Sequence, residues 1–175
     1  MINLEEEEKI LLEQRRHWFV IGTTGAIMFG VILAPIIFVI VILGAFPEIT
    51  AFFEDIKFIW IAVFFILSWT LIMWVSFFIA WTDYYLDVLI VTNKRVVDVE
   101  QRGLFRRDLA TVPLQNIQDI KIEINGLIPT LLRFGNLHIQ TAGVSKEVLI
   151  KDIKEPTEVK KIILSAYHDT LGKQL

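Results

Sequence analysis

The sequence predicts a membrane α-helical hairpin, formed by two transmembrane helices, followed by a mainly-β α+β domain: a small antiparallel barrel with a C-terminal helix. Two long blocks, residues 18–46 and 58–82, contain no ionisable side chain. The rest of the chain first shows short alternating runs, typical of antiparallel strands, and then helical spacing from residue 156. A hydrophobic fraction of 54% and a mean hydropathy of +0.57 exceed those of an ordinary soluble domain.

Each apolar block is long enough to cross a bilayer, which requires roughly 20 apolar residues. We therefore expect spans at about residues 18–43 and 58–81. An outer loop at 44–57 would join them, a polar tail at 1–17 would precede them, and a polar domain at 83–175 would follow.

The distribution of Lys and Arg predicts the orientation of the hairpin. The outer loop contains one basic residue, Lys57. The two flanking sides contain more basic residues: Lys9, Arg15, Arg16, Lys94 and Arg95. Because basic residues favour the cytoplasmic side, we expect a multi-pass protein of the inner (cell) membrane with both termini in the cytoplasm.

The N-terminal tail allows two interpretations. The acidic run Glu5–Glu8 and the following residues could form a helix that continues into the membrane. They could equally form a solvated acidic tail. The sequence leaves both open.

Aromatic residues mark the expected membrane interfaces. Trp60 and Trp81 would lie about 30 Å apart along a helix, which matches the hydrocarbon thickness. Trp and Tyr concentrate at the headgroup level. The predicted interface residues are Trp18, Trp60, Trp81 and Tyr84.

Span one carries a stripe of small residues: Gly22, Ala26, Gly30 and Ala34. Such a stripe lets another helix approach closely. The second helix could be span two of the same chain or a span of a second copy. Pro35 follows the stripe and should bend the helix, since it removes a backbone donor.

The chemistry that the sequence lacks limits its function. Neither span contains an ionisable residue, the usual mark of an ion or proton pathway, so anchoring is the better interpretation. The chain has no cysteine. His138 has no second ligand at metal-binding spacing, and no phosphate-binding or nucleophile motif is present. We therefore expect that the protein is not an enzyme and that it binds no cofactor, metal, nucleic acid or small-molecule substrate.

The alternating runs predict six strands and two clear turns. The turns are Thr92–Lys94 and Arg102–Gly103. Pro156 fits the first position of a helix that ends near Gly172. The strands are expected at residues 85–90, 97–100, 104–112, 119–124, 136–141 and 147–153.

The order of these segments resembles a known family. Two spans are followed by YYLDVLIVTNKRVVDVEQRGLFRRDLATVPLQNIQDI and then LLRFGNLHIQTAG. This series resembles the membrane-anchored bacterial pleckstrin-homology-like (PH-like) family, over residues 83 to about 154 and the two-span layout before them. The resemblance implies a PH-like barrel with a C-terminal helix, and no established catalytic reaction.

Basic residues are the candidates for lipid contact. Arg106 and Arg107 would point to opposite faces of a strand, which favours a fold feature with cross-strand ion pairs over one shared pocket. Lys94 and Arg95 lie in the first hairpin turn, where the resemblance implies phosphoinositide-binding residues in some PH-like domains. We expect either contact of Lys94, Arg95 and Arg107 with anionic lipid or a plain polar turn.

The segment NGLIPTLLRF (125–134) is unusually apolar for a turn region. Pro129 argues against a central strand. The segment could be a loop folded onto the barrel or an exposed patch that contacts a membrane or a partner. The residues of that patch would be Leu127, Ile128, Leu131, Leu132 and Phe134.

These observations predict a non-enzymatic, membrane-anchored PH-like module that acts as an interaction or assembly platform at the inner membrane face. Its expected partners are membrane lipids and either a second copy or another membrane protein. The alternative is a domain that senses anionic lipid. A subunit of a membrane enzyme or transporter is a third possibility.

Overall fold

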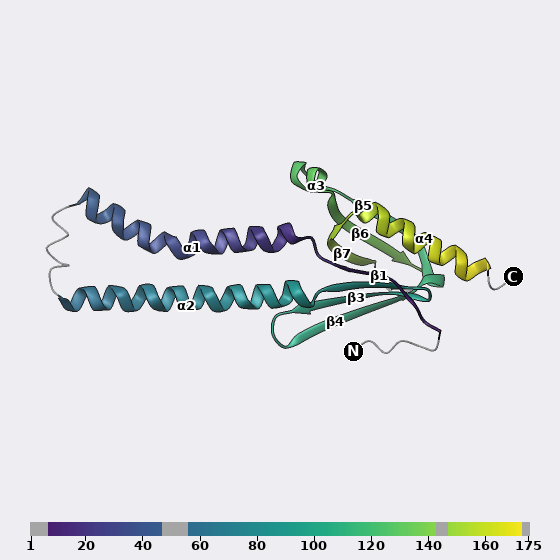
Figure 1. Ribbon diagram of the computed structural model, residues 1–175, viewed down its shortest axis with the longest axis horizontal. Helices are drawn as coiled ribbons and strands as arrows, with labels where there is room; N and C mark the ends of the chain where they lie inside the picture. The colour runs from purple at the N-terminus through teal and green to yellow at the C-terminus, as the bar shows by residue number, and fades with distance from the viewer. Residues whose placement is uncertain (1–6, 47–55, 143–146, 173–175) are drawn as a thin grey trace. The chain divides into compact units, whose positions relative to one another are not determined.

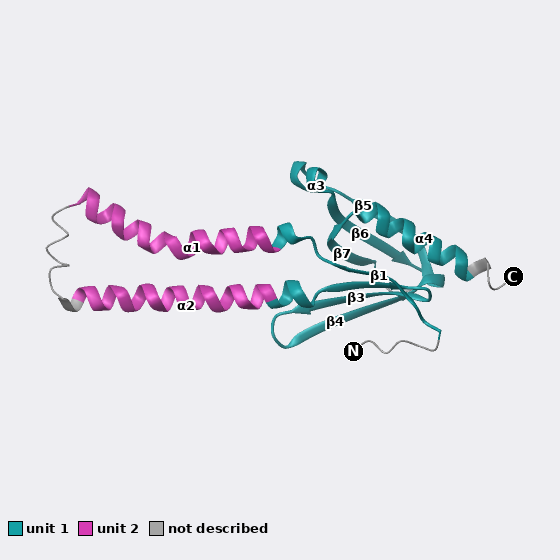
Figure 2. Ribbon diagram, viewed as in Figure 1, with its two compact units in different colours: residues 1–20, 82–175 teal, residues 21–81 magenta. Residues whose placement is uncertain are grey.

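The computed structural model describes residues 7–46, 56–142 and 147–172 (Figure 1). The chain forms two compact units (Figure 2). Residues 21–81 form the helical unit, and residues 1–20 together with 82–175 form the sheet unit.

The helical unit contains most of two long helices, α1 (Trp18–Ala45) and α2 (Ile56–Leu86). Both are long and apolar enough to cross a membrane, and no residue of their most apolar stretches is buried. The indole nitrogen of Trp69 donates a hydrogen bond to the carbonyl of Val31 (3.1 Å), which joins the two helices. Pro35 lies inside α1, and this helix bends part-way along its length (Figure 1). Most of the expected outer loop, residues 47–55, lies outside the described residues.

The sheet unit contains two antiparallel sheets. The first has four strands in the order β1 (Ile10–Arg15), β2 (Val88–Thr92), β3 (Arg95–Arg102) and β4 (Arg106–Pro113). The second has three strands in the order β5 (Ile117–Glu123), β6 (Phe134–Thr141) and β7 (Val148–Lys154). The connections and the last element are η2 (Leu114–Asn116), α3 (Leu127–Leu132) and α4 (Pro156–Gly172).

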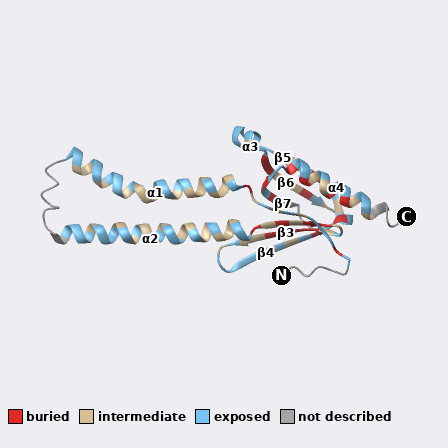
Figure 3. Cartoon of the chain, in the orientation of Figure 1, coloured by how far each residue is buried: buried red, intermediate tan, exposed pale blue. Residues whose placement is uncertain are grey.

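The core lies between the sheets and under α4, as the buried residues in Figure 3 show. Helix α4 begins at Pro156, as predicted, and buries Val159, Ile163 and Ala166 at helical spacing. Full burial of an aliphatic side chain stabilises a fold by about 1.5–3 kcal/mol. The strands supply the other core residues: Leu89, Val91, Val96, Val112, Ile120, Leu137, Ile139, Ile150 and Ile153, together with Leu114 of η2.

The helical hairpin is inserted between two neighbouring strands of one sheet. β1 precedes α1 and β2 follows α2, yet the strands pair, with Leu12 opposite Val91 and Gln14 opposite Leu89. The expected polar tail is therefore wrong for residues 10–15, which form neither a solvated tail nor a helical extension. The backbone hydrogen bonds of residues 10–15 are made with β2, which favours a strand over either alternative. The pairing also requires β1 and β2 to lie on the same side of any membrane that the hairpin crosses.

The other strands lie within two residues of their predicted bounds, and three elements differ in a way that has a physical reason. The strand expected from residue 85 begins at Val88, because α2 continues to Leu86. The strand expected from residue 104 begins at Arg106, because residues 103–105 form a turn. The expected loop at 125–134 contains the short helix α3. Pro129 is compatible with it, since the N–H groups of a first helical turn need no helical partner.

The close approach of β5 to β6 requires the glycine at position 135, in the segment FGNLHIQ. A Cβ atom at this residue would lie 2.7 Å from the carbonyl oxygen of Glu123 on β5. Only glycine therefore allows β5 and β6 to approach this closely.

Candidate membrane-facing surface

The two places where the chain passes between the sheet unit and the apolar helices are tied together. We call residues 16–19 and 82–87 the crossing segments. The Arg16 Nη2 atom lies 3.0 Å from Asp87 Oδ2 and 3.3 Å from Glu100 Oε1. The Arg15 guanidinium lies 4.3 Å from the ring centroid of Tyr85, a cation–π contact. Side chains just before α1 therefore hold the end of α2.

Arg16 lies in a half-buried cluster of carboxylates of the sheet unit: Asp87, Asp98 and Glu100. Burial raises the pKa of Asp98 to about 6, and the nearby Glu100 adds to this effect. Burial also raises the pKa of Asp87, although its Oδ1 atom accepts a hydrogen bond from the Gln101 N–H at 2.5 Å. This cluster lines a cavity of about 20 Å³, too small for anything but a water molecule. We assign it the structural role of joining β1, β2 and β3.

His17 joins the first crossing segment to the second sheet. Its ring stacks on Phe134, with centroids 4.7 Å apart and planes inclined by 15°. Its Nδ1 atom accepts a hydrogen bond from the Phe19 N–H (3.2 Å), and Phe19 also contacts Phe134 (5.7 Å between centroids). Burial lowers the pKa of His17, and the nearby Lys154 lowers it further, which agrees with an unprotonated Nδ1.

Helix α3 presents an apolar surface next to this contact. Leu127, Leu131 and Ile128 are 90%, 82% and 50% exposed. Leu132 is half-buried. Phe134 was expected in the same patch, but it is buried under His17 and Phe19, so that assignment is wrong. The segment is a short helix that contacts β6 and leaves Leu127, Ile128 and Leu131 exposed.

The turn between β3 and β4 presents a second apolar surface, which the sequence analysis missed. Gly103 adopts a φ of +71° and its N–H donates to Asp83 Oδ2 (3.1 Å). Phe105 is 99% exposed and Leu104 is 53% exposed. The available sign was the pair of apolar residues directly after the turn signal Arg102–Gly103, which the alternating pattern predicts to begin a strand.

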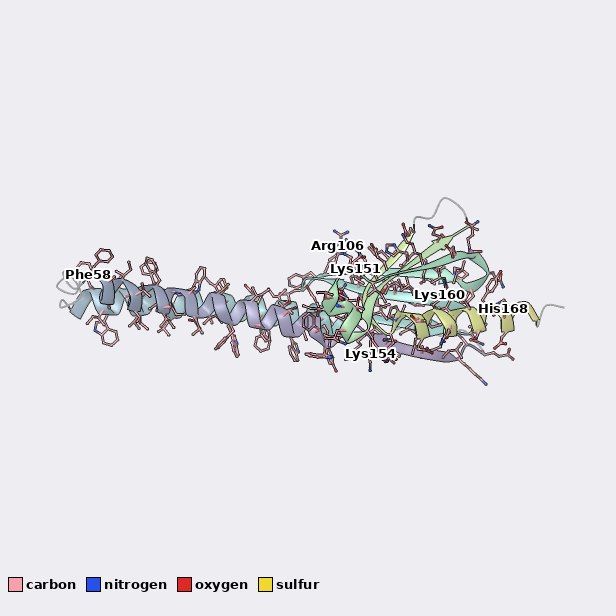
Figure 4. The ribbon with its side chains drawn as sticks, turned by 90° about the horizontal axis from the view of Figure 1, so that it is seen from above. Phe58, Arg106, Lys151, Lys154, Lys160 and His168 are labelled. Carbon is pink, nitrogen blue, oxygen red and sulfur yellow. The ribbon has the colours of Figure 1, made fainter. Side chains whose placement is uncertain are left out.

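Both apolar surfaces lie at one end of the sheet unit. Phe134, two residues after α3, packs on the first crossing segment. The Gly103 N–H donates a hydrogen bond to Asp83 in the second crossing segment. In Figure 2 the turn and α3 lie at the end of the sheet unit from which its short helical stubs leave. Arg106 and Lys154 lie toward this end in Figure 4, whereas Lys160 and His168 lie toward the other.

Lys94 and Arg95 do not lie at this end. They follow β2, whose other end adjoins Asp87 in the second crossing segment. The Arg95 guanidinium binds the carboxylate of Glu8 in a bidentate manner, at 2.9 Å from Nε to Oε1 and 2.8 Å from Nη2 to Oε2. The Glu8 side chain is fully buried and also accepts a hydrogen bond from Thr92. Arg95 is therefore a structural residue, and only Lys94 of this pair is exposed.

Arg106 and Arg107 behave as strand neighbours. Arg106 lies 3.5 Å from Asp108, which also forms the cross-strand ion pair with Arg102 at 3.4 Å. Arg107 is exposed and lies opposite Gln101 in the register. The two arginines do not share a pocket.

The small-residue stripe of α1 does not pack on α2. Gly22, Ala26, Gly30 and Ala34 are all exposed, and a Cβ atom at Gly30 would meet nothing within 4 Å. Instead, Gly25 faces α2, where a Cβ atom would lie 3.4 Å from Phe77. Span two of the same chain is therefore not the partner of the stripe. Trp18, Trp60 and Trp81, expected at the interfaces, are exposed by 61%, 67% and 47%, and Tyr84 is half-buried.

His138 bridges two carboxylates on the second sheet. Its Nε2 atom lies 2.8 Å from Glu123 and its Nδ1 atom 2.6 Å from Glu147. Hydrogen bonds from Asn125 and then His138 lower the pKa of Glu123. Both ring nitrogens therefore have a carboxylate partner, and His138 is a satisfied strand residue.

A groove of about 420 Å³ separates β4 from β7. Among the residues that the structure describes, each of these strands has one hydrogen-bonded neighbour in its sheet, apart from a single bridge between Arg16 and Ile153. Such edges can accept another strand. Four carboxylates and two cations line the groove, which therefore does not favour a phosphate headgroup: Asp98, Glu100, Asp108, Glu147, Arg102 and Lys151.

Two antiparallel sheets capped by a C-terminal helix, in a chain that also has two long apolar helices, define a PH-like protein with a candidate membrane anchor. The family comparison agrees: the model of the Bacterial PH domain family matches residues 25–167, and the chain belongs to this family.

Solved structures give weaker similarities. One is a DUF1696 family protein with a pleckstrin-homology domain from Shewanella loihica PV-4, at 18% identity and a TM-score of 0.38, covering 46% of this chain and 70% of that one. Another is a pleckstrin-homology domain from Shewanella amazonensis SB2B, at 18% identity and a TM-score of 0.36, covering 44% of this chain and 63% of that one. A comparison with curated proteins finds no match.

Proposed function

We propose that this protein is a non-enzymatic, membrane-anchored PH-like module that acts as an interaction and assembly platform at the inner face of the cell membrane. One observation carries the proposal: the helical hairpin is inserted between β1 and β2 of a single sheet. Such an insertion fixes the domain to the membrane surface at two points without a flexible linker. The Arg16–Asp87 ion pair links the segment before α1 to the segment after α2.

The orientation and the lack of chemistry have separate support. The Lys and Arg distribution favours both termini on the cytoplasmic side. The non-enzymatic part rests on the PH-like fold, which supplies no reaction by itself.

Self-association is the assembly that we propose. The exposed stripe of α1 offers a surface where a second copy could approach closely. The groove between β4 and β7 offers a second surface, with two strand edges, for a protein segment. Another membrane protein that uses the same stripe is the alternative partner.

The anionic-lipid alternative loses its main residues. Arg95 is already bound by Glu8, and its turn follows the end of β2 opposite to the second crossing segment. Arg107 alone, among the three candidate residues, lies near the apolar turn.

The test is the oligomeric state of the full chain in lipid nanodiscs, measured by native mass spectrometry over a range of protein-to-lipid ratios. We expect dimers or larger assemblies for the wild type. Gly30→Leu should shift them to monomers, since the new side chain fills the stripe without a clash inside the chain. Gly44→Leu, the same change beyond the stripe and also without a nearby atom, should leave them intact. A wild-type monomer at every ratio would overturn the assembly part.

A further inference from the structure

We propose that the sheet unit inserts two apolar tips into the interfacial layer of the same bilayer that the hairpin crosses. The first tip is Leu104 and Phe105 of the β3–β4 turn. The second is Leu127, Ile128 and Leu131 of α3. We call these residues the membrane tips. The inference rests on the proposed membrane anchoring. It adds a contact with lipid outside the two spans.

The exposure of the membrane tips calls for an apolar environment. Phe105 is 99% exposed, Leu127 90% and Leu131 82%. A soluble surface tolerates single apolar residues, but two clusters at one end of a domain mark an interaction site. Neither tip contributes to the buried core of the sheet unit.

The position of the membrane tips identifies the bilayer as the occupant. The first tip is held by the hydrogen bond from the Gly103 N–H to Asp83, two residues after the exposed Trp81. The second is held through Phe134, which packs on His17 and Phe19 at the start of α1. Each tip is thus attached to a different crossing segment. Because both crossing segments must lie at the membrane surface if the hairpin spans it, both tips lie near that surface.

Two exposed cations accompany the membrane tips. Arg107 follows Phe105 by two residues, and Arg133 directly follows α3. Basic residues beside apolar side chains fit a lipid interface, where the apolar groups enter the acyl boundary and the cations remain among the headgroups. A protein partner would also fit an apolar surface, but nothing ties such a partner to both crossing segments.

The absence of cysteine from the chain allows a direct test with single labels. Leu104→Cys and Ile128→Cys place an environment-sensitive fluorophore at each tip and leave Phe105, Leu127 and Leu131 in place. His168→Cys is the control at the other end of the sheet unit, and its side chain is exposed (Figure 4). Phe65→Cys, at a residue of α2 that is 67% exposed, reports on the hairpin. Each full-length variant is reconstituted into vesicles that contain phosphatidylcholine and phosphatidylglycerol.

The readout is quenching by nitroxides on the upper acyl chain compared with quenching by aqueous iodide. We expect the labels at 104 and 128 to be quenched by the lipid nitroxide at least threefold more than the label at 168. Adding Phe105→Ser to Leu104→Cys should reduce that quenching at least twofold. Adding Leu109→Ser to Leu104→Cys, at an exposed apolar residue of β4, should leave the quenching unchanged.

Two results would overturn the inference. In the first, the tip labels respond to iodide as strongly as the label at 168. In the second, they are protected from both quenchers, which would show that protein covers them. In either case a lipid-quenched label at 65 would leave the membrane anchoring intact. An unquenched label at 65 would instead show that the proposed function fails.

Discussion

The two hairpin turns at the ends of β3 each have a pair of basic residues but differ in their surroundings. The β2–β3 turn carries Lys94 and Arg95, and the β3–β4 turn is followed by Arg106 and Arg107. An eight-residue strand spans about 25 Å, so the turns lie at opposite ends of the sheet. The first is fixed by the buried carboxylate of Glu8. The second is fixed by Asp83 and leaves Phe105 exposed on the surface of the domain.

The difference shows that a basic pair in a turn does not identify a lipid site. The first turn has the charge expected of a PH-like ligand loop, but its arginine is needed to neutralise a buried carboxylate. The second turn has an apolar tip next to a crossing segment. Substitutions at the first turn should therefore change stability, and substitutions at the second should change membrane contact.

The largest effect on the free energy of unfolding is expected from the loss of the ion pair at the first turn. Glu8→Ala removes the bidentate partner of Arg95 and leaves this guanidinium, which is 23% exposed, without its buried counter-charge. We expect a loss of about 2–4 kcal/mol in the free energy of unfolding. Thermal unfolding of the full chain in detergent, followed by circular dichroism, should show a midpoint lower by about 5–15 °C. Glu13→Ala, at an exposed residue of β1, is the control. Equal midpoints for the two variants would contradict the structural role of this turn.

An intermediate effect is expected at Asp98, in the middle of β3 between the turns. Its folded pKa of about 6 lies above the unfolded value of 3.8, so the folded state binds the proton more tightly. The stability that this group contributes is therefore lost as pH rises from about 4 to 6. Asp98→Asn should raise the free energy of unfolding by about 1–3 kcal/mol at pH 7.5 and by much less at pH 4.5.

Chemical denaturation of the wild type and Asp98→Asn at both pH values gives the measurement. Asp119→Asn, at an exposed strand carboxylate, serves as the control. A benefit of Asp98→Asn that is equally large at both pH values would show that the charge is not its cause.

The smallest effect on stability is expected at the second turn. Phe105→Ser should change the free energy of unfolding in detergent by no more than about 0.5 kcal/mol, because the ring touches little of the folded chain. The same denaturation experiment measures this. A loss above about 1 kcal/mol would show that Phe105 packs on the domain, and the contrast between the two turns would disappear.

The parts of the fold that depend on local pattern could be predicted from the sequence. The two apolar helices follow from their lack of charge, and α4 follows from the spacing of Val159, Ile163 and Ala166. The turns after Thr92 and Arg102 follow from their polar and glycine residues.

The parts that depend on distant partners could not be predicted. β1 has few core-facing apolar side chains, and its partner strand lies beyond the hairpin, with Leu12 opposite Val91. The Glu8–Arg95 pair joins residues 87 positions apart. α3 was missed because Pro129 discourages a helix everywhere except in its first turn. Exposure of Phe105 depends on where the turn ends, which an alternating pattern does not fix.

The most direct test of the account is whether residues from both sides of the hairpin form one sheet in the membrane. Glu13 and Ile90 lie opposite each other in the β1–β2 register. The double variant Glu13→Cys/Ile90→Cys should form a disulfide rapidly under mild oxidation in native membranes, since directly opposed strand residues meet the distance that a disulfide requires. Glu13→Cys/Val88→Cys, two residues out of register, should form it slowly. An equally low yield for both pairs would contradict the insertion of the hairpin between β1 and β2.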